Sequence, residues 1–178
     1  AIVTTGALPH SDELVSMLKR GLPSLASCIH GINRNPRDPG IGSKTELLFG
    51  SAELAETVCG LKFNVGAHSF LQVNPEQTQK LYLAAANALN LTANDDVADV
   101  FCGIGTISLL LAQRARSVLG IEAVPPAVKD ARRNAKLNNI KKAEFICENA
   151  ETALPRLVAE GKRFSAILLD PPRRGAEK

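Results

Sequence analysis

From Val65 onward, apolar runs of strand length alternate with segments of helical periodicity, and this alternation limits the possible folds more than any other feature. We predict a helix over 75–89, with Asn74 as its N-cap and Pro75 at its first position. Strands are predicted over 96–101, 117–122, 143–147 and 164–170, with helices over 106–113, 126–137 and 151–160. Largely apolar strands joined by helices predict a mostly parallel sheet covered on both faces, which is a doubly wound α/β fold.

Residues 1–64 follow another pattern and are expected to form a small α/β subdomain ahead of the domain over 65–178. Ser11 is predicted to cap a helix over 12–20, and strands are predicted over 25–32 and 46–49, with a turn-rich stretch over 33–40 between them. The chain starts without Met and stops just after a motif that normally continues into more sheet. We therefore expect a piece of a longer protein, truncated at the C-terminal end of its sheet.

The composition is that of a globular protein, with 45% hydrophobic and 22% charged residues. The net charge of +3 permits an RNA partner without arguing for one, because Lys and Arg are spread along the chain. Aromatic residues make up only 4%, which disfavours a base-stacking platform. The sequence has no signal peptide and no apolar run of about 20 residues, so we expect a cytoplasmic protein without a membrane partner.

The four cysteines, Cys28, Cys59, Cys102 and Cys147, form no C-x-x-C pair. Without such a pair a zinc site is not expected, and without secretory signals a disulfide framework is expected even less. We interpret them as reduced, mostly buried thiols, and Cys102 as a packing residue. No metal is expected in this chain.

Ligands of parallel sheets bind outside the carboxyl ends of the strands, so the loops at those ends are the candidate site. The first loop, over 99–106, contains Gly103 and Gly105, which allow a sharp turn and close approach of the backbone to a ligand. Ser108 stands where a dinucleotide fingerprint has Gly or Ala, which argues against NAD. Asp99 favours a ligand with a positively charged amino group, such as S-adenosylmethionine, over a plain turn without a ligand.

The other strand ends add further polar groups. Glu122 lies 17 positions after Gly105, where a carboxylate suits the ribose hydroxyls of a nucleoside. Asn149 either reaches the exocyclic amine of adenine or simply caps the next helix. Two prolines follow Asp170 and aim its carboxylate into the cleft. Arg173 replaces the aromatic residue that amino-group methyltransferases have at this point, which argues against an exocyclic amine as the methylated atom.

Together these motifs resemble the RNA (uracil-5-)-methyltransferases, which act on ribosomal or transfer RNA. The resemblance rests on D-V-F-C-G-I-G-T at 99–106, on Glu122, on D-P-P-R-R-G at 170–175 and on F-L-Q-V-N at 70–74. The last of these is similar to a segment that unrelated methyltransferases lack. The match is good from Leu47 to Lys178 and looser before it. The implied fold is that of the class I S-adenosylmethionine-dependent methyltransferases.

The resemblance also implies roles for individual residues. The implied cofactor-binding residues are Gln72, Phe101, Gly103, Gly105, Thr106, Glu122, Asn149 and Asp170. The implied uracil-binding residues are Phe70, Gln72 and Asp170, since an amide and a carboxylate can recognise the polar edge of a flipped base. Without the resemblance, a helix-capping or merely exposed amide would be as good an interpretation of Gln72 as a binding residue.

The chemistry of the family requires a cysteine thiolate that adds to carbon-6 of uracil and a glutamate that removes the proton from carbon-5. Both are expected beyond Lys178, so this chain should bind S-adenosylmethionine and be inactive alone. We expect a monomeric enzyme that methylates carbon-5 of a uridine during rRNA or tRNA processing. The alternatives are a methyltransferase for another RNA base or atom, and a non-catalytic RNA-binding relative.

Overall fold

The computed structural model describes residues 1–35, 40–171 and 175, and these form two compact units. One unit comprises residues 1–54 and 66–68, and the other comprises residues 55–65 and 69–178. In the predicted turn-rich stretch, residues 36–39 lie outside the described residues, as do Pro172 and Arg173 of the last motif. In the described part of the chain, no helix has the length and apolar character needed to cross a bilayer.

The first unit is built on a three-stranded sheet in the order β1-β2-β3, with one helix. Its elements are β1 (Ile2–Thr4), α1 (Ser11–Gly21), β2 (Ser27–Ile32) and β3 (Lys44–Gly50). Strand β1 runs parallel to β2, and β3 runs antiparallel to it. The predicted N-cap at Ser11 is wrong: His10 takes the N-cap position in the left-handed conformation, without a side-chain cap, and Ser11 is already helical.

Two strands that the sequence analysis did not predict follow, β4 (Glu53–Val58) and β5 (Leu61–Gly66). They pair with each other, and two asparagines, one in α4 (Pro125–Leu137) and one just after it, bond to the backbone of β5. Asn138 Oδ1 accepts from the Lys62 N–H at 2.9 Å, and Asn134 Oδ1 accepts from the Asn64 N–H at 2.9 Å. The amides thus satisfy backbone groups of β5 as a neighbouring strand would.

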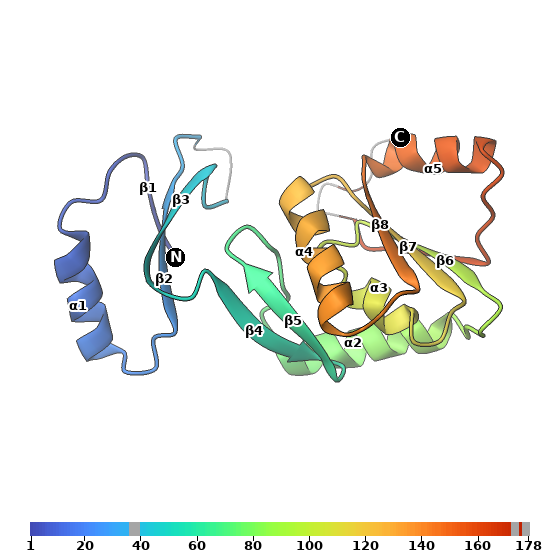
Figure 1. The fold of residues 1–178 in the computed structure, drawn as a ribbon, viewed down its shortest axis with the longest axis horizontal. Helices are drawn as coiled ribbons and strands as arrows, with labels where there is room; N and C mark the ends of the chain where they lie inside the picture. Colours follow the sequence, from blue (N-terminus) through green and yellow to red (C-terminus); the bar gives the residue numbers. More distant parts are fainter. Residues whose placement is uncertain (36–39, 172–174, 176–178) are drawn as a thin grey trace. The chain divides into compact units, whose positions relative to one another are not determined.

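The second unit contains the predicted parallel sheet, in the strand order β8-β7-β6-β9, of which Figure 1 labels β8, β7 and β6. Its strands are β6 (Asp96–Val100), β7 (Ser117–Glu122), β8 (Ala143–Cys147) and β9 (Ala166–Leu169). Its helices are α2 (Pro75–Ala88), α3 (Thr106–Leu111), α4 (Pro125–Leu137) and α5 (Ala150–Ala159). All three strand pairings are parallel, which confirms the predicted doubly wound α/β fold.

Helices cover both faces of this sheet. On one face, residues of α2, α3 and α4 share a core with Val97, Val118 and Phe145 of the sheet. On the other face, α5 packs through Ala153 and Leu157 onto inward side chains of β6 and β7. Because both faces are buried, the strands consist of continuous apolar runs, which is why the sequence pattern located them well.

Gly120 of β7 leaves the space that the ring of Phe145 fills on the neighbouring strand. A Cβ at this position would lie 2.5 Å from Cδ1 of Phe145 and 2.8 Å from Sγ of Cys102. We expect Gly120→Ala to lower the free energy of unfolding by about 2 kcal/mol, because close-packed cores resist added volume. Urea denaturation of the chain would measure the loss.

Gly21→Ala is the matched control, because a Cβ there has no atom within 4 Å and the change should stay within about 0.5 kcal/mol. Adding Phe145→Leu to Gly120→Ala should give less than the sum of the two single losses, since the two side chains compete for one space. Strictly additive losses would show that the ring of Phe145 is not what excludes the Cβ.

Candidate functional site

A cleft opens at the carboxyl ends of β6 and β9 and encloses about 410 Å³, part of it open to solvent. Its walls come from the loop after β6, the segment before α2, one side chain of α2 and the residue after β9. The lining residues are Phe70, Gln72, Tyr82, Asp99, Phe101, Cys102, Gly103, Ile104, Thr106, Ile107 and Asp170. These include two carboxylates and, among the described residues, no Lys, Arg or His, so the cleft suits a cationic ligand.

The loop after β6 turns through left-handed backbone conformations. Phe101 has a φ of 67°, which is uncommon for a residue with a side chain. Its N–H and that of Cys102 both donate to the carbonyl of Ile121, at 2.9 and 3.1 Å. These bonds hold the strained residue at the end of the strand, where strain of this kind is typical of ligand sites.

The two glycines of this loop have different roles. Gly105 has a φ of 82°, and a Cβ there would lie 3.0 Å from the ring of Phe145, so it is required by packing as well as by backbone conformation. Gly103 has a φ of 56°, and a Cβ there would meet no atom within 4 Å. Gly103 also lines the cleft, whereas Gly105 does not. Gly103 is therefore the glycine that exposes backbone to a ligand.

Glu122, at the end of β7, is joined to the glycine loop by hydrogen bonds. Its Oε2 accepts from the N–H of Gly103 at 3.0 Å, and its Oε1 accepts from the N–H of Val124 at 2.9 Å. A carboxylate has about four lone-pair positions, so each oxygen can still accept from a ligand hydroxyl. Glu122 does not itself line the cleft, but it fixes the loop that does.

Asp99 is almost fully buried, with 1% of its surface exposed, and its partner is Ser108 of α3. The Ser108 hydroxyl donates to Asp99 Oδ2 at 2.5 Å. Burial raises the pKa of Asp99 to about 7, although the Ser108 bonds lower it, and the charges of Asp170 and Glu122 raise it further. Asp99 and Asp170 thus line the cleft and Glu122 is bonded to its glycine loop, so a cation bound in the cleft would favour the ionised form of Asp99.

The segment before α2 is fixed at both ends and presents two side chains to the cleft. Ser69 Oγ donates to Asp130 Oδ2 at 2.6 Å, and the Asn74 side chain accepts from the Gln77 N–H at 3.1 Å as the predicted N-cap. Between these anchors, Phe70 and Gln72 line the cleft. The ring of Phe70 is 73% exposed, so it is available to contact a further ligand.

The structure brings most of the predicted site residues together. Those lining one cleft are Phe70, Gln72, Phe101, Gly103, Thr106 and Asp170. Asn149 is exposed and lies outside the lining. It occupies the N-cap position of α5, but its side chain makes no capping bond. The side-chain cap is therefore absent, and contact of Asn149 with adenine stays a prediction.

Sequence reasoning missed several parts of the site. Tyr82 of α2 lines the cleft, and burial raises the pKa of its hydroxyl. The sequence analysis used Ser108 only as an argument against NAD. In the structure Ser108 is buried on α3, and its hydroxyl donates to Asp99. Its place at the third position of α3, nine residues after Asp99, was the available signal.

None of the four cysteines is in a disulfide, and two of them, Cys28 and Cys102, are buried. Burial raises the pKa of Cys102, so this thiol stays protonated and is a poor nucleophile although it lines the cleft. Cys147 is the exposed thiol, in β8. Across the described residues, no three His, Cys, Asp or Glu side chains gather as a metal site would require.

Comparison with known proteins finds similar sequences and folds. Residues 91–171 match a protein-family model described as a methyltransferase domain. The chain is 41% identical over 178 residues to an uncharacterized RNA methyltransferase of Halalkalibacterium halodurans, with 99% of this chain and 39% of that protein covered. It is 42% identical over 176 residues to another from Enterococcus faecalis, with 99% and 38% covered.

Among solved structures, the chain is similar to the Pyrococcus abyssi tRNA (uracil-54, C5)-methyltransferase in complex with S-adenosyl-L-homocysteine. The TM-score is 0.69 and the sequence identity is 24%, and the match covers 97% of this chain and 39% of that one. An S-adenosylmethionine-dependent methyltransferase from Agrobacterium tumefaciens gives a TM-score of 0.64 and 23% identity over 86% and 49%. The fold is that of the class I methyltransferases. The chain spans about two fifths of the length of the curated relatives that it matches.

Proposed function

We propose that this chain binds S-adenosylmethionine and forms the cofactor-binding part of an enzyme that methylates carbon-5 of a uridine in RNA. The observation that carries the proposal is that Asp99 and Asp170 line a cleft at the carboxyl ends of a parallel sheet, while Glu122 is bonded to the glycine loop of that cleft. S-adenosylmethionine carries a sulfonium and an ammonium group, and a cleft whose described lining has two carboxylates and no cationic side chain favours both.

The residues present fit this cofactor. Gly103 leaves open space beside its backbone, and Glu122 retains acceptor capacity for ribose hydroxyls next to that glycine. Asp99 offers a carboxylate to an ammonium group. When bound, the cofactor supplies an electrophilic methyl group, and the chain's part is to hold it and to exclude water around it.

Uridine as the substrate is proposed from the F-L-Q-V-N segment and its position. Phe70 and Gln72 lie on the same cleft as Asp170, so a flipped base entering there would meet a ring, an amide and a carboxylate. The relatives named RNA methyltransferases and the tRNA uracil methyltransferase of similar fold support RNA as the substrate class.

We further propose that the nucleophile comes from residues outside this chain. The thiol of Cys102 is held protonated by burial, and Cys147 is on β8, whereas Asp170 follows β9 on the opposite edge of the sheet. This chain alone should therefore bind the cofactor without turnover.

Two measurements test the proposal. Calorimetry of the chain with S-adenosylhomocysteine should give saturable binding, and its absence at millimolar ligand would overturn the cofactor assignment. The full-length protein, incubated with S-adenosylmethionine and an RNA transcript, should then yield 5-methyluridine in nucleoside mass spectrometry. Another methylated nucleoside would replace uridine as the substrate, and RNA binding without any product would identify a non-catalytic relative.

A further inference from the structure

The solvent-facing side of α4 carries a row of basic side chains that are not adjacent to one another along the whole of the sequence but share one side of the helix. Four basic residues recur at helical spacing and share one side of the helix: Lys129, Arg132, Arg133 and Lys136. The buried side of the same helix consists of Ala127, Val128, Ala131, Asn134 and Ala135. We call the four basic residues the cationic stripe. They lie at i, i+3, i+4 and i+7, so the stripe follows the helix over two turns.

The four basic residues of the stripe are not all balanced by carboxylates of the same helix. Helix α4 has a single acidic residue, Asp130, whose side chain is 13% exposed and accepts from Ser69 while lying 3.6 Å from Arg133. Among the described residues, no carboxylate comes within ion-pair distance of Lys129 or Lys136. An ordinary solvated helix face usually alternates acids and bases at i, i+4, and α4 does not.

Helix α5, on the opposite face of the sheet, provides a contrast within the same unit. Its Arg156 pairs with Glu148 at 2.6 Å and with Glu160 at 2.8 Å, so its charge is balanced locally. Lys129 and Lys136 of α4 therefore differ from Arg156 of α5, because neither lysine has a carboxylate partner among the described residues.

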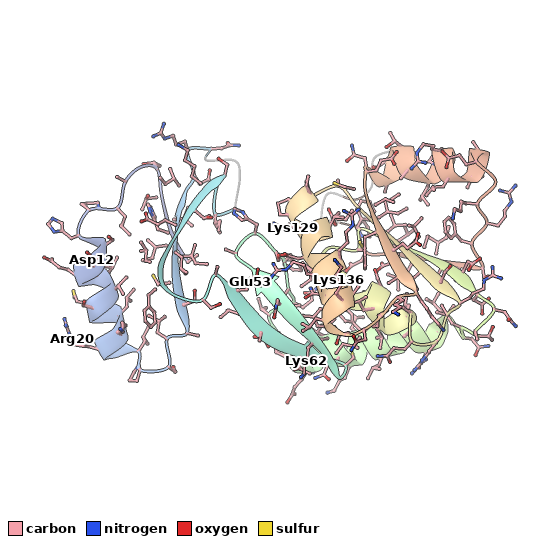
Figure 2. The ribbon with its side chains drawn as sticks, in the orientation of Figure 1. Asp12, Arg20, Glu53, Lys62, Lys129 and Lys136 are labelled. Atoms are coloured by element: carbon pink, nitrogen blue, oxygen red, sulfur yellow. The ribbon has the colours of Figure 1, made fainter. Side chains whose placement is uncertain are left out.

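The neighbouring strand extends the stripe. The side chain of Asn138, just after α4, accepts from the N–H of Lys62 at 2.9 Å and donates to the carbonyl of Lys62 at 2.6 Å. These bonds keep the exposed Lys62 of β5 beside the end of the helix. Figure 2 labels Lys62, Lys129 and Lys136, which project from β5 and α4 of the same unit.

The stripe also has a defined relation to the candidate site. Helix α4 begins three residues after Glu122, and the N–H of Val124, which precedes the helix, donates to that carboxylate. Asp130 in turn anchors the segment that carries Phe70 and Gln72. The helix that bears the cations thus adjoins both the cofactor loop and the candidate base-binding segment.

We propose that the cationic stripe and Lys62 form a docking surface for the phosphate backbone of the substrate RNA. The proposal rests on the proposed function, in that it assumes an RNA substrate. Lysines without carboxylate partners, such as Lys129 and Lys136 among the described residues, bind phosphates by releasing counterions, which gives affinity without sequence readout. The surface positions the RNA, and the cleft selects the base.

The test uses the full-length protein with the substitutions Lys62→Gln, Lys129→Gln and Lys136→Gln combined. Its control combines Lys44→Gln, Lys80→Gln and Lys162→Gln, which remove the same charge from exposed positions outside α4 and β5. Binding of a fluorescently labelled RNA stem-loop is followed by anisotropy over a series of salt concentrations. The stripe variant should bind at least about 10-fold more weakly, with a log–log salt slope reduced by about 2, and the control should change little.

Calorimetry with S-adenosylhomocysteine separates this proposal from the proposed function. The stripe variant should bind that ligand as the wild type does, because none of its substitutions touches the cleft. Unchanged RNA affinity and slope in the stripe variant, or an equal loss in the control, would overturn the docking surface while leaving the cofactor assignment intact. A wild type that binds the cofactor analogue but no RNA would also overturn it.

Discussion

Replacing Glu122 with alanine is expected to weaken binding of S-adenosylhomocysteine by about 100-fold, since a hydrogen bond to a charged group contributes about 1.5–3 kcal/mol. Two effects combine in this loss. The carboxylate would no longer accept the ribose hydroxyls, and the N–H groups of Gly103 and Val124 would lose the acceptor that fixes the loop. Calorimetric titration of the chain measures the change directly.

Glu122→Gln separates the two effects. The amide keeps one oxygen acceptor for a backbone N–H but turns an NH₂ donor toward the other, so we expect an intermediate loss of about 10-fold. Glu144→Ala, at an exposed position of β8, removes a carboxylate without touching the loop and should leave binding unchanged. An affinity within about threefold of wild type for Glu122→Ala would refute the role assigned to this carboxylate.

The sequence predicted the second unit well because its signals are local and repeated. Apolar strands buried on both faces and helices with caps such as Asn74 leave a strong pattern, and β7 and β8 were predicted with their observed bounds. Helix and strand ends elsewhere differ by one or two residues, as at β9, which begins at Ala166 where Phe164 was predicted.

The missed hairpin of β4 and β5 shows where such reasoning fails. Its turn consists of Cys59 and Gly60, both with positive φ, at 51° and 78°. This conformation is typical of a tight hairpin turn, but Cys-Gly is not among the residue pairs that signal one. Most of β4 is exposed, so it lacks the alternation that would have indicated a strand.

The candidate site was predictable in its strand-end residues and not in their partners. The position of Asp99 at a strand end predicted its place at the cleft, but its bond to Ser108 depends on the orientation of α3. The cationic stripe was missed for a related reason. Its residues are separated along the sequence and combine only when the helical period of α4 brings them to one side.

Replacing Asp99 with asparagine is expected to stabilise the fold above pH 7 and to weaken ligand binding, two effects of opposite sign. The folded-state pKa of Asp99 is raised from 3.8 to about 7 by burial, so the folded protein holds a proton that the unfolded chain releases from about pH 4 upward. Stability of the wild type should therefore fall as the pH rises from about 4 to about 7, and Asp99→Asn should lack this contribution.

Urea denaturation at pH 5 and pH 8 measures the difference. Asn retains an oxygen acceptor and can donate to the Ser108 hydroxyl, so the buried contact is preserved. At pH 8 the variant should exceed the wild type by about 3 kcal/mol in free energy of unfolding, and the gain should shrink toward pH 5. A variant less stable than wild type at pH 8 would mean that the ionised carboxylate stabilises the fold.

Binding should change in the other direction. An ionised Asp99 attracts the ammonium group of S-adenosylhomocysteine, so the affinity of the wild type should rise with pH through about 7. Asp99→Asn should bind about 10-fold more weakly at pH 8, with that rise abolished. Ionisation of Asp99 would then lower the free energy of unfolding of the unliganded protein and raise its affinity for S-adenosylhomocysteine. Such a pair of effects means that the ligand compensates the charge of the carboxylate. That combination would distinguish a binding residue from one that serves only the packing of α3 against β6.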